Sequence, residues 1–175
     1  MNRLISGLLM ATGLLLSPAI VSAEDNQALI MQARSAAPSM VSADATVMYQ
    51  GKVLAEGSNG WTCMPETMPG DNSPICNDAV WMEALAAVGS KGPFEAKEMG
   101  FSYMLGGDGG VSNSDPYHAD HMNAEDYIKE GPHLMIIVPK ASLEGITTDP
   151  HAGGPYVMWK DTPYAHIMIP VGERD

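Results

Sequence analysis

Hydrophobic and polar positions along the chain repeat with two periods, one typical of helices and one typical of strands. Apolar residues fall at helical spacing over residues 80–88. Asn77 or Asp78 offers an N-cap for this helix, and Gly89 is expected to end it. Residues 25–37 are rich in Ala, Leu, Gln and Met and are followed by a proline, so they predict a second helix near the N-terminus.

Alternation of apolar with polar residues predicts strands at residues 45–50, 52–55 and 100–105. The tripeptide Ser-Asn-Gly at 58–60 predicts a hairpin turn before Trp61, because Asn-Gly accepts the positive φ angles that such turns require. We therefore expect an antiparallel hairpin early in the chain.

The last third of the chain predicts three strands, each entered through a proline: Pro132, Pro155 or Pro163. Residues 134–138 are apolar on both alternating faces, so their strand is expected in the centre of its sheet. A short helix or turn around residues 141–145 would link the first two of these strands.

Residues 106–123 form a long segment dominated by Gly, Asp, Ser, Asn and His. Loops of this length are uncommon inside a compact domain and are often either functional or disordered. The order of elements favours an α+β fold, with a mostly antiparallel sheet packed with two or three helices and one disulfide. No domain boundary is visible, so residues 24–175 are expected to form a single globular domain.

Residues 1–23 have the features of a signal peptide. A short basic start with Arg3 precedes a mostly apolar stretch at 4–16, and Val-Ser-Ala at 21–23 predicts cleavage after Ala23. The apolar stretch is too short for a comfortable bilayer span, and no later stretch approaches the roughly 20 apolar residues of a transmembrane helix. The sequence predicts export to the periplasm or to the extracellular space.

The two cysteines, Cys63 and Cys76, are expected to form a disulfide, because an exported protein meets an oxidising compartment. Their spacing is unlike Cys-x-x-Cys, and neither neighbourhood holds a histidine or a cluster of cations that would lower a thiol pKa. The segment between them contains three prolines and a glycine, which predicts a loop closed at its base by the disulfide.

The charge balance bears on the choice of partner. The chain carries 9 Lys and Arg against 21 Asp and Glu, and its formal net charge is −12. Such a field repels phosphate backbones, and the basic residues are scattered, so nucleic acid and anionic membrane surfaces are poor partners. A small ligand, a metal ion or a protein remains open, and the acidic surface favours a cationic ligand or simply solubility.

Candidate chemistry comes from histidine and methionine. All five histidines lie in the final third, and the chain holds 14 methionines. Imidazole and thioether groups together suit copper, and Cu(I) in particular. Residues two apart on a strand share a face, so the pairs His133/Met135 and His166/Met168 could hold an ion between neighbouring strands.

A second candidate copper site lies in the long loop, where His118 and His121 form a His-x-x-His pair beside Asp120 and Met122. These two histidines with Asp120 are also the best set for a metal-dependent hydrolase, although no nucleophile elbow, phosphate-binding loop or His-Glu-x-x-His pair is present. Methionine is also an adaptable core residue, and most methionines here neighbour apolar residues, so ordinary packing explains them without a metal.

Calcium is a further alternative, because the same Gly-rich region offers oxygen ligands. The candidate ligands are Asp108, Asn113, Asp115, Asp120 and Asp126. Their spacing matches neither an EF-hand nor a calcium-binding nonapeptide, and a solvated acidic loop would have the same composition.

Five segments resemble a family of small secreted bacterial proteins. They are WTCMP at 61–65, VWME at 80–83, SNSDP at 112–116, GPHLMIIVP at 131–139 and PYAHIM at 163–168, and the resemblance extends over most of the chain from about Ala45 onward. It implies export and a single domain. The family supplies no activity, cofactor or site residue that could be carried over.

The leading expectation is a non-enzymatic periplasmic or extracellular protein that acts as a binding or accessory module for an unknown ligand. The alternative is a copper-binding protein that uses His133, Met135, His166 and Met168, with His118 and His121 as a further pair. A secreted metal-dependent hydrolase is the third hypothesis.

Overall fold

A computed structural model describes residues 23–174 of the chain. The predicted signal peptide, apart from Ala23, lies outside the described residues. The helices are α1 (Ala23–Arg34), α2 (Ser39–Ser42) and α3 (Ala79–Ser90), with short 3-10 helices η1 (His121–Asn123) and η2 (Lys140–Leu143). The strands are β1 (Thr46–Tyr49), β2 (Lys52–Ala55), β3 (Thr62–Met64), β4 (Ile75–Asn77), β5 (Gly100–Met104), β6 (Val111–Ser112), β7 (Tyr127–Ile128), β8 (His133–Ile137), β9 (Tyr156–Met158) and β10 (His166–Pro170).

Eight strands form one sheet in the order β2-β1-β3-β4-β5-β8-β10-β9, and β6 pairs with β7 in a small ribbon. Every neighbouring pair in the large sheet is antiparallel except β1 and β3. This confirms the expected α+β fold with a mostly antiparallel sheet. The strand predicted at 134–138 is β8, and it lies inside the sheet between β5 and β10, as its apolar faces indicated.

The early hairpin forms, but its turn is not where the sequence placed it. Strands β1 and β2 pair with each other and are connected by a turn at Gln50 and Gly51. The φ angles of these two residues are positive, 48° for Gln50 and 75° for Gly51. The Ser-Asn-Gly turn at 58–60 instead returns the chain past β1, so β3 runs parallel to β1. The prediction of a hairpin turn there is wrong, because Asn59 donates a hydrogen bond to the Val41 carbonyl and ties the turn to α2 rather than to a paired strand.

The predicted helix at 80–88 is α3, and its N-cap is Asp78, whose carboxylate accepts a hydrogen bond from the backbone N–H of Trp81 at 2.9 Å. Gly89 does not end it. The helix continues to Ser90 and is closed by Lys91 in the left-handed conformation, whose N–H bonds back to the last turn.

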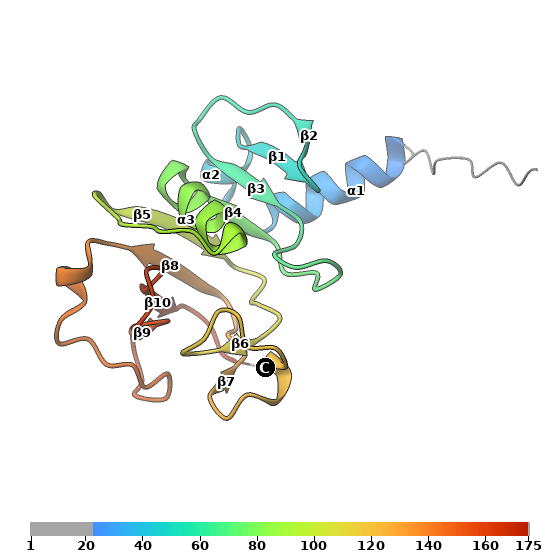
Figure 1. The fold of residues 1–175 in the computed structure, drawn as a ribbon. Coiled ribbons are helices and arrows are strands. Elements are labelled where there is room, and N and C mark those ends of the chain that lie inside the picture. Colours follow the sequence, from blue (N-terminus) through green and yellow to red (C-terminus); the bar gives the residue numbers. More distant parts are fainter. Residues whose placement is uncertain (1–22, 175) are drawn as a thin grey trace, which may run out of the picture.

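Helices α1 and α3 cover opposite faces of the sheet (Figure 1). Since side chains alternate along a strand, Cys76 and Tyr103 face α1, whereas Ile75 and Met104 face α3. Helix α3 approaches β5 closely because Gly100 has no side chain: a Cβ there would lie 2.7 Å from the Cβ of Val80.

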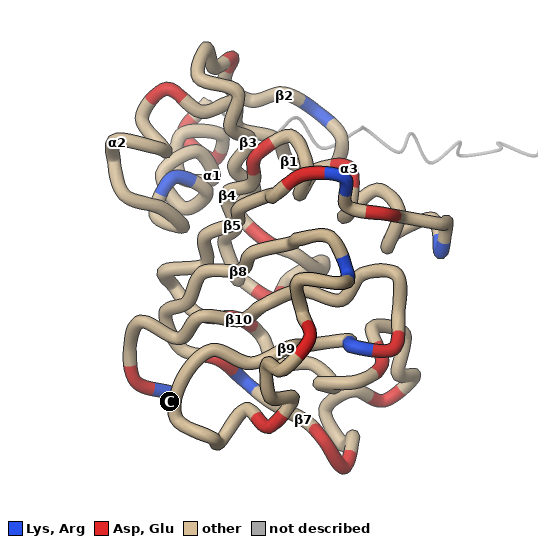
Figure 2. Tube along the Cα trace, turned by 90° about the vertical axis from the view of Figure 1, so that its left-hand side faces the viewer, with Lys and Arg blue, Asp and Glu red and all other residues tan. Residues whose placement is uncertain are grey.

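The expected disulfide is present between Cys63 and Cys76, which are direct partners in the β3–β4 register with their Cα atoms 4.0 Å apart. It closes the loop at its base, as the sequence predicted. Acidic residues are spread over the whole trace, and Lys and Arg occur singly along it (Figure 2).

Candidate functional site

The residues predicted to bind copper from the two strands line one cavity of about 200 Å³. Strands β5, β8, β10 and β9 form its floor, and α3 covers it with Trp81, Leu85 and Val88. A larger hollow of about 630 Å³ lies beside Lys140 and Asp161, but it contains none of the predicted site residues. The smaller cavity is therefore the candidate site.

Register places the key residues of the cavity on one face of the sheet. Met135 on β8 is directly opposite Met168 on β10, so the two methionines form a cross-strand pair. His133 and His166 are each two residues before one of these methionines, and each therefore lies on the same face as its methionine. Because β8 and β10 are antiparallel, the histidines lie at opposite ends of the methionine pair.

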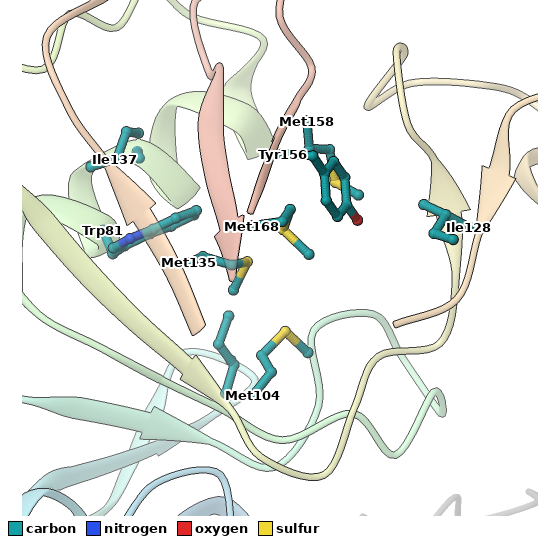
Figure 3. Close-up of a cluster of buried hydrophobic side chains, with 10 residues drawn as sticks. Trp81, Met104, Ile128, Met135, Ile137, Tyr156, Met158 and Met168 are labelled. Atoms are coloured by element: carbon teal, nitrogen blue, oxygen red, sulfur yellow. The ribbon is translucent and has the colours of Figure 1, made fainter. Parts of the chain in front are cut away.

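Each histidine also faces a methionine from its other neighbouring strand. Met104 on β5 is directly opposite His133, and Met158 on β9 is directly opposite His166. Figure 3 shows Met104, Met135 and Met168, from three adjacent strands, with their thioether groups turned toward one another. The cavity thus brings together two imidazoles and four buried thioethers.

Both imidazoles are buried and held by the backbone. The Nδ1 atom of His133 lies 2.7 Å from the Gly131 carbonyl oxygen, and that of His166 lies 2.8 Å from the Tyr164 carbonyl oxygen. A carbonyl oxygen only accepts hydrogen bonds, so each Nδ1 carries a proton, and the neutral form of a ring bonded in this way has its lone pair at Nε2. Neither Nε2 has a hydrogen-bond partner in the structure, although both are buried.

Burial keeps His166 uncharged. Loss of hydration lowers the pKa of His166 to about 4; the hydrogen bond to the Tyr164 carbonyl opposes this shift, and the neighbouring His133 adds to it. The rings of Trp81 and Trp159 both contact His166 edge-on, with ring centroids 5.1 Å from the imidazole centroid. At neutral pH this side chain is a neutral imidazole held in a fixed orientation.

A carboxylate lies at the His133 end of the cavity. Asp108 lines the cavity and accepts hydrogen bonds from the N–H groups of Gly110 and Glu130, both at 2.9 Å. Burial raises the pKa of Asp108, whereas the nearby His133 and these hydrogen bonds lower it, and burial is the larger effect. This is the acidic side chain of the cavity lining.

A buried ion pair adjoins this end. Glu130 is almost fully buried, and it accepts hydrogen bonds from the Tyr156 hydroxyl at 2.8 Å and from Nε of Arg174 at 2.9 Å. Burial, and then the hydrogen bond to Glu130, raise the pKa of Tyr156. The ion pair between Arg174 and Glu130 thereby holds the last described residues against the segment that leads into β8.

The loop closed by the disulfide reaches the cavity from the side of the solvent. Thr67 and Met68 belong to its lining, and Met68 is 36% exposed, so its thioether lies between the cavity and the surface. Asp71 stabilises this part of the loop by accepting hydrogen bonds from the backbone N–H groups of Thr67 and Met68.

The other predicted metal site receives no such support. His118 is exposed and its Nδ1 accepts a hydrogen bond from the Asp120 N–H, while Met122 is 59% exposed at the surface. Among residues 23–174, no three His, Cys, Asp or Glu side chains lie close enough together to hold an ion. The loop pair His118 and His121 therefore has no third ligand of these types beside it among the described residues, and its role in binding copper or in a hydrolase stays a prediction.

Two of the acids proposed as calcium ligands accept hydrogen bonds within turns. Asp115 accepts from the Tyr117 N–H at 2.8 Å, and Asp126 accepts from Ser112 and Ser114. Partial burial disfavours ionisation of Asp126, but the hydrogen bonds from the two serines outweigh it and lower its pKa. These side chains order the segment between β5 and β7.

Sequence reasoning missed three lining residues, Met104, Met158 and Met68, and assigned Asp108 to calcium. Met104 and Met158 lie in segments predicted as strands, but their proximity to the histidines depends on which strands are neighbours in the sheet. The available signal was that both strands place a methionine on their buried face.

Comparisons of the chain with protein-family models, with curated proteins and with solved structures returned no match. Among the described helices, none is both long enough and apolar enough to cross a bilayer. The disulfide and this finding are compatible with an exported protein.

Proposed function

We propose that this protein is an exported, non-enzymatic binding protein whose ligand is Cu(I), held in the cavity between α3 and strands β5, β8, β10 and β9. The observation that supports this most strongly is the pair of buried Nε2 atoms, one on His133 and one on His166, that lack a partner in a cavity lined by methionines.

An unsatisfied buried nitrogen has an energetic consequence. A buried polar atom without a hydrogen bond costs about 1–3 kcal/mol, and the cavity lining holds three of them: Nε2 of His133, Nε2 of His166 and the indole Nε1 of Trp81. A metal ion bound at Nε2 would remove this cost at the two histidines. Histidine ligands of metals typically donate the other ring N–H to a carbonyl or a carboxylate, which fixes the ring. The hydrogen bonds from His133 to Gly131 and from His166 to Tyr164 have this form.

The donor set favours Cu(I) over other common ions. Thioethers are soft ligands that select Cu(I), whereas calcium and magnesium require several oxygen ligands. Structural zinc sites use thiolate, imidazole and carboxylate groups in fours, and the cavity lining provides two imidazoles and a single carboxylate. A singly charged ion also suits a site that is largely apolar, because the cost of burying charge is smaller.

Met68 provides the route into the cavity. Its thioether is the partly exposed member of a methionine series that continues inward to Met104, Met135 and Met168. A weak surface ligand beside stronger buried ones suits a protein that receives an ion in the periplasm or outside the cell and keeps it bound.

The test is an anaerobic competition titration with a chromophoric Cu(I) chelator. The purified protein should remove Cu(I) from the chelator, and the double variant His133→Ala/His166→Ala should lose this ability. The matched control is His118→Ala/His121→Ala, which also removes two histidines but from outside the cavity, and it should compete as well as the parent protein.

Circular dichroism would verify that both double variants are folded. Failure of the parent protein to compete would overturn the proposal, and so would equal competition by the folded cavity variant.

A further inference from the structure

We infer that the cavity holds two Cu(I) ions at separate positions rather than one ion shared by both histidines. The first position is His133 with Met104, and the second is His166 with Met158; the pair Met135 and Met168 lies between them. This inference rests on the proposed function and specifies its stoichiometry.

The strand register separates the histidines. Pro170 is directly opposite His133 on β10, and His166 lies four residues before Pro170. At about 3.3 Å per residue, the backbone positions of the two histidines are offset by roughly 13 Å along the strands. Metal–imidazole bonds are about 2 Å long, so two nitrogens on one ion lie at most about 4 Å apart.

The hydrogen bonds of the rings act against bringing the histidines together. Each Nδ1 is bound to the carbonyl oxygen two residues earlier in its own chain segment, at 2.7 Å for His133 and 2.8 Å for His166. Rotating either ring toward the other end of the cavity would break this bond. The edge contacts of His166 with Trp81 and Trp159 restrict that ring further.

Each histidine has a thioether within reach on an adjacent strand. Directly opposite residues in an antiparallel pair have Cβ atoms about 4.5–5.5 Å apart, so an imidazole and a thioether there can bind the same ion. His133 and Met104 are such a pair, and so are His166 and Met158. The central methionine pair can complete either position.

Charge distinguishes the two positions. Two positive charges in one cavity repel each other, so the second ion should bind about tenfold more weakly than the first. Asp108, the carboxyl group of the lining, lies at the His133 end. The ion at His133 should therefore bind first.

Tryptophan fluorescence reports on the other position. Trp81 and Trp159 both contact His166, and neither ring contact involves His133. Copper near an indole quenches its emission, so most of the quenching should accompany the second ion.

The experiment combines native mass spectrometry with anaerobic chelator competition and tryptophan emission, with Cu(I) supplied as its chelate. We expect two ions on the parent protein and one on each single variant, His133→Ala and His166→Ala. Quenching should persist in His133→Ala and be largely lost in His166→Ala.

Methionine variants keep the inference testable if a histidine variant does not fold. Met104→Leu and Met158→Leu preserve volume, and each should weaken one of the two binding steps about tenfold or more while leaving the other within twofold. A single ion on the parent protein that either histidine variant abolishes would overturn the two-ion inference and leave the proposed function standing. No Cu(I) bound to the parent protein would overturn both.

Discussion

The two faces of the sheet are packed by different kinds of side chain. On the face covered by α1, small residues surround the disulfide, and the buried cluster contains Ala33, Ala36, Ala45 and Val47. On the face covered by α3, the buried cluster contains Met104, Met135, Met158 and Met168 and lines a cavity. Small rigid side chains and a cross-link fix a shape, whereas long flexible ones leave space that can adapt to a ligand.

The largest effect should come from the ion pair beside the cavity. Arg174→Ala leaves the buried Glu130 carboxylate without its cation, and breaking a buried pair in this way costs about 3–5 kcal/mol. The free energy of unfolding, measured by urea titration, should fall by that amount, whereas the exposed control Lys97→Ala should change it by less than about 0.5 kcal/mol. A similar small change for Arg174→Ala would contradict the role of this pair.

Removal of the disulfide should lower the stability of the fold while changing copper binding little. Cys63→Ala/Cys76→Ala releases a loop with a sequence separation of 13, and the free energy of unfolding should fall by about 3 kcal/mol. The buried imidazoles and thioethers of the cavity lie on the other face, and of its lining the released loop contributes Thr67 and Met68 at the solvent side, so the folded double variant should still bind Cu(I) within threefold of the parent protein. A large loss of copper affinity with the fold intact would show that the two faces depend on each other.

Acid should destabilise the copper-free protein through the cavity face. The pKa of His166 is about 4 in the folded state against 6.5 in the unfolded state, so the unfolded chain binds protons more readily and stability falls as the pH is lowered from about 6.5 to 4. The loss is at most about 3 kcal/mol.

The groups that face His166 modify this acid effect. His133 lies on the same face and adds to the lowered pKa, and the raised pKa of Asp108 returns a little stability at the acid end. His166→Phe should flatten the dependence between pH 6.5 and 4 in urea titrations. An unchanged slope in this variant would assign the acid effect to other groups.

The smallest effects should come from two substitutions that test how each face of the sheet tolerates a change of side chain. Met135→Leu conserves volume and should cost less than about 1.5 kcal/mol, whereas Ala36→Leu adds bulk to a fully buried position and should cost about 1–3 kcal/mol. Thermal unfolding of both variants would measure the difference. Equal costs would mean that the two faces are packed alike.

Local signals predicted the elements that local chemistry determines. The cap at Asp78 and the apolar spacing after it predicted α3, and the apolar faces of residues 134–138 predicted an interior strand. The disulfide followed from the cysteine count and the predicted export. Each of these conclusions depends on residues close together in sequence or on composition alone.

Long-range pairing could not be predicted in the same way. The parallel pairing of β1 with β3 depends on where the chain goes after the turn at 58–60, and turn residues alone do not encode this. For the same reason the sequence did not identify Met104 and Met158. That they lie directly opposite His133 and His166 can be known only once the strand order is known. For the loop pair His118 and His121, which stays a prediction, a ligand-like spacing likewise does not determine where the nitrogen lone pairs point.

The hydrogen bonds from His133 to Gly131 and from His166 to Tyr164 span two residues each, so a three-residue segment contains the hydrogen bond that orients each ring. The imidazoles are set when the strands form, before any ion arrives, and binding need not reorganise them. Such a segment could be transplanted to a strand of an unrelated sheet and would carry its geometry with it. The design of soft-metal sites in new proteins could therefore begin from two such segments on antiparallel strands, with methionines placed opposite them.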